Sequence, residues 1–76
     1  MTTRTFPATD AQIQSLVTLL AEHGIVFDPT QPHGEEKTGG WDVSWDLAPG
    51  AITISLIKSP FLESGLFWSK VQDVLG

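Results

Sequence analysis

The residues best suited to chemistry lie in one short segment, where a histidine is closely followed by two glutamates. His33, Glu35 and Glu36 carry the imidazole and carboxylate groups that bind zinc and other divalent metals. No second histidine lies at a helical or hairpin spacing from His33 that would complete a site. We therefore expect a solvated segment here. A metal-binding protein or small metal-dependent enzyme using these three residues is the alternative.

The other reactive side chains do not form a pattern typical of nucleophilic catalysis. The chain has no cysteine, and none of its serines lies in a G-x-S-x-G turn. Phosphate-binding glycine loops of the G-x-G-x-x-G or G-x-x-x-x-G-K-S/T type are also missing. A general base needs a nucleophile and an orienting group within hydrogen-bond reach, and the sequence indicates neither for His23. We expect His23 instead to end the first helix, where a positive charge interacts favourably with the helix dipole. We expect no catalytic residue, no cofactor and no metal, and hence a protein that is not an enzyme.

Acidic residues gather in the middle of the chain, with Lys37 as the only nearby base. Such a group can form a docking surface for a basic protein partner, although charged surfaces also simply keep proteins in solution. Trp41 is added to the candidates because tryptophan is enriched at binding hot spots, and we expect this one to be partly exposed. The candidate contact residues are Glu35, Glu36, Trp41, Asp42 and Asp46.

Length and charge narrow the class of protein. A chain of 76 residues with 41% hydrophobic residues forms one small domain, residues 1–76. Its formal net charge is −5, and its 4 Lys and Arg residues do not cluster as binding to nucleic acid or an anionic membrane requires. The absence of a signal-like or membrane-spanning apolar segment predicts a cytoplasmic protein.

A helix is predicted over residues 10–23. Thr9 and Gln12 have the spacing of a capping box, and Gly24 suits the left-handed position that ends a helix. Apolar residues recur between them at the spacing of one helical face: Ile13, Leu16, Val17 and Leu20. A second helix is predicted over 65–75, with Phe67, Val71 and Val74 as its stripe.

The clearest pattern is a hairpin formed by residues 41–47 and 52–56. Apolar and polar residues alternate in both segments, which is typical of strands with one buried face. Folding at Pro49-Gly50 pairs Leu47 with Ile52, Trp45 with Ile54 and Val43 with Leu56. We expect a four-residue loop over 48–51, because a two-residue Pro-Gly turn has the wrong twist.

The remaining segments complete an α+β fold with the order α-β-β-β-α. Residues 1–8 are predicted to be a short tail, either extended or flexible, 25–28 a short strand, and 29–40 a long loop. One layer of helices is enough to cover a sheet with one apolar face, so both helices should lie on the same side. The other face should be open to water and carry Asp42, Ser44, Asp46, Thr53 and Ser55.

These observations favour a non-enzymatic binding module that uses the acidic sheet face and the long loop. The expected partner is another protein, or a second copy that pairs through an unpaired strand edge. A subunit of a larger assembly is a further possibility.

Overall fold

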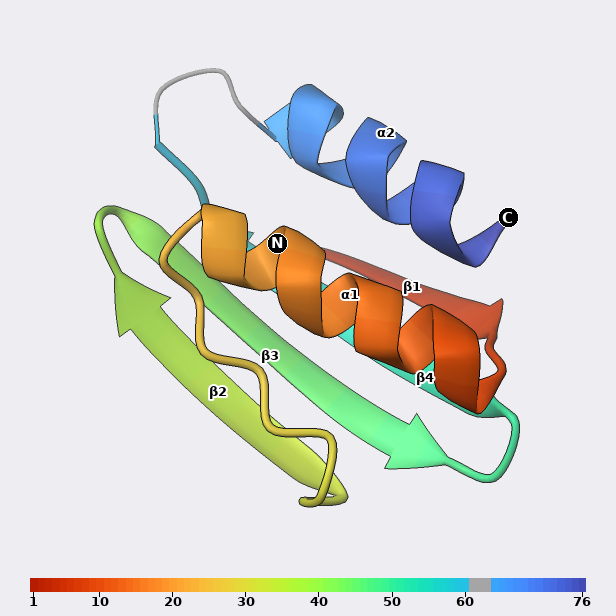
Figure 1. The fold of residues 1–76 in the computed structure, drawn as a ribbon. Coiled ribbons are helices and arrows are strands. Elements are labelled where there is room, and N and C mark those ends of the chain that lie inside the picture. Colours follow the sequence, from red (N-terminus) through yellow and green to blue (C-terminus); the bar gives the residue numbers. More distant parts are fainter. Residues whose placement is uncertain (61–63) are drawn as a thin grey trace.

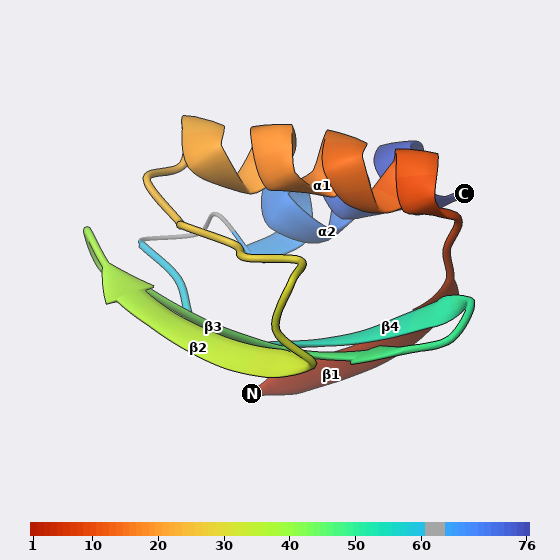
Figure 2. The same ribbon diagram turned by 60° about the horizontal axis from the view of Figure 1, so that its bottom comes forward.

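The computed structural model describes residues 1–60 and 64–76, which form a sheet and a helical layer (Figure 1). The elements are β1 (Thr2–Pro7), α1 (Asp10–Glu22), β2 (His33–Thr38), β3 (Trp41–Ala48), β4 (Ala51–Lys58) and α2 (Ser64–Leu75). Within the described residues the four strands form an antiparallel sheet in the order β1-β4-β3-β2. Figure 2 shows both helices on one face of that sheet. The predicted α+β class and its layering are confirmed.

The hairpin register is confirmed residue by residue. Leu47 pairs with Ile52, Trp45 with Ile54 and Val43 with Leu56. The predicted four-residue loop is wrong, however, because Ala48 pairs with Ala51 and leaves only Pro49 and Gly50 in the turn. Gly50 has a φ of 74°, which the third position of a type II turn requires, and proline is common at the position before it.

The N-terminal segment is a strand, so of the two predictions for residues 1–8 the extended conformation is confirmed and the flexible tail is wrong. β1 pairs along β4 from Thr2 to Pro7. Thr3 and Thr5 each form a 2.9 Å hydroxyl–hydroxyl hydrogen bond across the strands, with Ser55 and Thr53 respectively. β-branched threonines favour strands, and the partner strand completes the pairing that a sequence pattern alone does not reveal.

The predicted long loop over 29–40 contains β2, which pairs with β3 from His33 to Thr38. Gly39 and Gly40 connect the two strands with φ values of 55° and 86°. Two consecutive residues of positive φ are what a type I′ hairpin turn needs, and Gly-Gly is a preferred pair for it. The element order is therefore β-α-β-β-β-α rather than α-β-β-β-α.

Residues 25–28 do not form the predicted short strand. Ile25 and Phe27 are nevertheless buried, whereas Val26 between them is 70% exposed. The segment joins α1 to β2 and contributes two side chains to the core without pairing its backbone in the sheet. Buried and exposed side chains therefore alternate along this segment, as in a strand, although its backbone is not paired with another strand.

α1 begins as predicted. Thr9 Oγ1 accepts a hydrogen bond from the Gln12 backbone N–H, and Gln12 Oε1 accepts one from the Thr9 N–H, at 3.2 and 2.8 Å. The helix ends one residue earlier than predicted, with His23 as its C-cap and Gly24 at a φ of 76°.

A single cluster of buried side chains lies between the sheet and the two helices. The sheet contributes Trp41, Val43, Trp45, Ile52, Ile54 and Leu56, and the helices contribute Leu16, Leu20, Phe67, Trp68, Val71 and Leu75. The stripes predicted on both helices thus face this core, although Ile13, Val17 and Val74 are only partly buried.

Candidate functional site: an acidic sheet face

The pairing of β2 with β3 decides which polar side chains share a surface. Gly34 pairs with the buried Trp45 and Glu36 with the buried Val43, so these β2 residues are on the helix side. Because successive strand residues point to opposite faces, their neighbours lie on the outer face, away from the helices. The acidic face consists of Glu35, Asp42 and Asp46, together with His33, Ser44 and Lys37.

Two carboxyl groups meet at the centre of the acidic face. The pKa of Glu35 is raised, first by a hydrogen bond with the Asp42 carboxyl and then by the negative charge of that group. Two carboxylates can hydrogen-bond only when one of them is protonated. When both are ionised, Asp42 Oδ1 is buried without a hydrogen-bond partner among the described residues.

Lys37 offsets this negative charge only weakly. Its Nζ lies 4.0 Å from Asp42 Oδ2, and its side chain is 72% exposed, compared with 15% for Asp42. Exposed ion pairs of this kind are worth roughly 0–1 kcal/mol. The Glu35–Asp42 pair therefore retains most of its like-charge repulsion. A further positively charged group placed beside the pair would be attracted to it.

Gly34 leaves room on β2 for a large side chain of β3. A Cβ atom on Gly34 would lie 2.8 Å from Cζ2 of Trp45, which is closer than packed carbon atoms approach. The indole of Trp45 thus occupies the space that any other residue would need. A larger residue at position 34 would displace this indole or β2 itself, and Glu35 is the next residue along β2.

An open hollow of about 460 Å³ lies on the same pair of strands. His33, Glu35, Ser44 and Asp46 are among its lining residues. His33 pairs directly with Asp46, so an imidazole borders two of the carboxylates. The Gly-Gly turn would have revealed this arrangement, since it fixes the pairing of the two strands.

The structure brings together only some of the predicted contact residues. Glu35, Asp42 and Asp46 share the acidic face, whereas Glu36 is half-buried on the helix side. Trp41 is 6% exposed, so the partial exposure expected for it is wrong. His23 and Phe67 cover its ring, with centroid distances of 5.2 and 5.4 Å.

The residues considered for a metal site do not converge. His33 and Glu35 lie on the outer face, but Glu36 lies on the opposite side of β2. In residues 1–60 and 64–76, no group of three or more His, Cys, Asp or Glu residues is arranged to hold a metal ion.

Comparison with known proteins adds no relatives from which a function could be transferred. The chain matches no protein-family model, and neither curated proteins nor solved structures give a significant match. None of the described helices has the length and apolar character needed to cross a membrane. A function must therefore be inferred from the residues of this chain.

Proposed function

We propose that this protein is a non-enzymatic binding protein whose acidic face docks a basic segment of another protein. The observation that carries the proposal is the Glu35–Asp42 pair, two adjacent carboxyl groups with one weakly placed lysine beside them. A lysine or arginine from a partner would relieve the repulsion between these two carboxyl groups. Arginine suits this role because its fork of donors fits carboxylate geometry.

The character of the face indicates what kind of binding to expect. Its side chains are polar or charged, and the large aromatic residues of β3 are buried on the other side. Each exposed charge pair contributes only about 0.2–1 kcal/mol. We therefore expect fast and salt-sensitive association with a basic partner, since complementary charge raises association rates more than affinity.

Pairing between two copies through β2 is a weaker alternative. β2 lies at one edge of the described sheet and carries Glu35 and Glu36 beside a single lysine. Two such strands would bring like charges together, and charged side chains on an edge strand oppose pairing. The same charges would attract a basic segment.

A titration with a synthetic octalysine peptide, followed by the backbone amide signals in NMR spectra, tests the proposal. We expect shifts confined to residues of β2 and β3, above all at Glu35, Asp42 and Asp46. The double variant Glu35→Gln/Asp42→Asn should weaken binding severalfold. The matched control Glu22→Gln/Asp73→Asn makes the same change in net charge on the helices, and it should bind almost as well as the parent.

Two results would contradict the proposal. Equal weakening by both double variants would mean that the peptide responds only to the net charge of the protein. Shifts that map to the helices would place the peptide elsewhere. Near-identical spectra of each free variant and the parent ensure that a loss of binding is not a loss of fold.

A further inference from the structure

β1 and β2 form the two edges of the described sheet, and each has backbone groups that point outwards. Ala8, directly after β1, donates its N–H to the Gly50 carbonyl at 3.0 Å. Just before β2, the Pro32 carbonyl accepts a hydrogen bond from the Leu47 N–H. In an antiparallel pair such bonds recur at every second residue. The residues whose N–H and C=O groups point away from the sheet are therefore Thr3 and Thr5 in β1, and His33, Glu35 and Lys37 in β2.

The helix-side surfaces of the two edges carry opposite charges. Arg4 pairs with the buried Ile54, so it lies on the helix side of β1, where its guanidinium stacks 4.8 Å from the centroid of the Trp68 ring. Glu36 lies half-buried on the helix side of β2. Within residues 1–60 and 64–76, neither Arg4 nor Glu36 forms an ion pair. Each edge thus presents one charged group that lacks a counterion among the described residues.

β1 and β2 also match in length and direction. Each strand has 6 residues, and the antiparallel pairing throughout the sheet makes its two edges antiparallel to each other. If β1 of one copy lies antiparallel to β2 of a second copy with complete overlap, Thr2 is opposite Thr38 and Arg4 is opposite Glu36. A shift by two residues would place Gly34 or Thr38 opposite Arg4 and would remove the charge pair.

The fully overlapped register also suits the backbone and the neighbouring side chains. The outward N–H and C=O groups of the two strands meet in it, so hydrogen bonds form on both sides of the Arg4–Glu36 pair. Arg4 and Glu36 themselves form a non-hydrogen-bonded pair, in which opposite side chains approach most closely. Phe6 lies opposite Gly34, and an aromatic neighbour across the strands stabilises a glycine at a sheet edge.

The helical layer leaves room for such a neighbour. Four strands about 4.8 Å apart span about 19 Å, and two helices packed about 8–10 Å apart span about 16–20 Å. Figure 1 shows α2 on the β1 side of α1, and neither helix lies over β2. The two layers of one copy are therefore about equally wide, and α2 would lie beside the uncovered helix side of β2 in the next copy.

We propose that this protein self-associates head to tail, with β1 of one copy paired antiparallel to β2 of the next and Arg4 opposite Glu36. Pairing of two β2 strands would oppose like charges, whereas β1 carries no acidic residue. Because each copy in a dimer keeps one free edge, association continues beyond the dimer. The side chains of the acidic face point away from the helices and stay accessible, so this inference stands or falls independently of the proposed function.

Reversal of the two charges tests the proposal by sedimentation velocity at micromolar to millimolar concentrations. We expect the parent protein to form species that grow with concentration. Arg4→Glu and Glu36→Arg each place like charges at every β1–β2 interface, and each should weaken association about fivefold. Mixing the two variants restores an opposite pair between unlike copies, so the mixture should associate like the parent. The controls Lys70→Glu and Glu22→Arg make the same charge changes on the helices and should leave association unchanged, alone or mixed.

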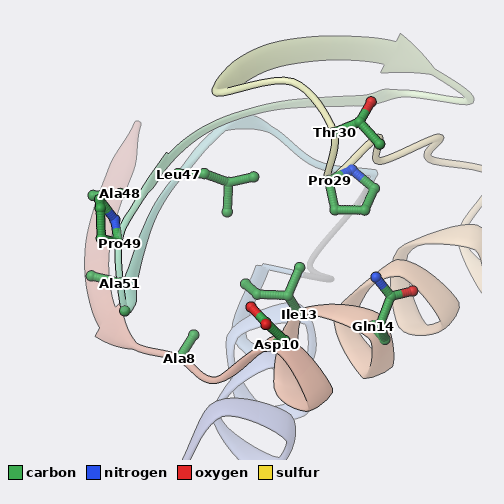
Figure 3. Close-up of a pocket in the computed structure, with 11 residues that line it drawn as sticks. Ala8, Asp10, Ile13, Gln14, Pro29, Thr30, Leu47, Ala48, Pro49 and Ala51 are labelled. Atoms are coloured by element: carbon green, nitrogen blue, oxygen red, sulfur yellow. The ribbon is translucent and has the colours of Figure 1, made fainter.

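An NMR measurement on the parent protein needs no variant. In a mixture of isotope-labelled and unlabelled protein, we expect an intermolecular NOE between the Hα atoms of Arg4 and Glu36, because these atoms are close in a non-hydrogen-bonded pair. A hollow of about 310 Å³ at the start of α1 (Figure 3) supplies reference signals, since its described lining includes Ile13 and Leu47 but no residue of β1 or β2. These signals should not change with concentration.

Three results would overturn the proposal. A parent protein that stays monomeric at millimolar concentration would do so directly. Association that neither Arg4→Glu nor Glu36→Arg weakens would place the contact elsewhere, as would a mixture of the two variants that associates no better than its components. If either variant fails to fold, the parent still decides, because associated protein without the Arg4–Glu36 NOE would contradict the β1–β2 interface.

Discussion

Gly34→Ala is the substitution that most directly tests how the core positions the acidic face. The added methyl group would lie 2.8 Å from Cζ2 and 3.0 Å from Cε2 of Trp45. Trp45 is 5% exposed and packs edge-on against Phe27 with ring centroids 5.0 Å apart, so its indole has little room to move. Overpacking of this kind costs about 1–3 kcal/mol. For a domain of this size each kcal/mol lowers Tm by about 4–8 °C.

Gly65→Ala is the matched control, because a Cβ on Gly65 meets no heavy atom within 4 Å. Gly65 lies in α2, where alanine is favoured over glycine by up to about 1 kcal/mol. Thermal unfolding followed by circular dichroism should therefore show a lower Tm for Gly34→Ala and an equal or higher Tm for Gly65→Ala. NMR spectra of Gly34→Ala should also change at Glu35 and Asp42. An unchanged Tm and unchanged signals on the acidic face would refute the inference that the Trp45 indole needs a glycine at position 34.

The other predictions concern the carboxylates and the helix start. Asp42→Asn should lower the pKa of Glu35 towards its ordinary value of 4.5, measured by NMR titration, because Asp42 is what raises it. In the parent protein this raised pKa makes stability fall as pH rises from about 4.5 through the folded-state value. Asp28 affects stability in the opposite direction, because hydrogen bonds from Thr30 lower its pKa below 3.8. The stability that Asp28 adds is present above pH 3.8 and is lost as pH falls through the lowered pKa. Thr30→Val should shift the Asp28 titration upwards. Thr9→Ala should cost about 1 kcal/mol in urea unfolding, through loss of the cap.

The β3–β4 hairpin could be predicted because its pattern admits one register. Trp45 and Ile54 face the core together, and a slip by one residue would turn every apolar side chain to the wrong face. The capping box at Thr9 could also be predicted, since it depends only on two residues that are three apart in the sequence. Both features depend on residues that are close together in the sequence.

The edge strands could not be predicted in the same way. β1 and β2 contain few large apolar residues, so neither shows the alternation that marks a half-buried strand. Their pairing with β4 and β3 makes them strands, and in β2 the only local signal is the Gly39-Gly40 turn. That Glu35 and Glu36 lie on opposite faces follows only once this turn makes residues 33–38 a strand.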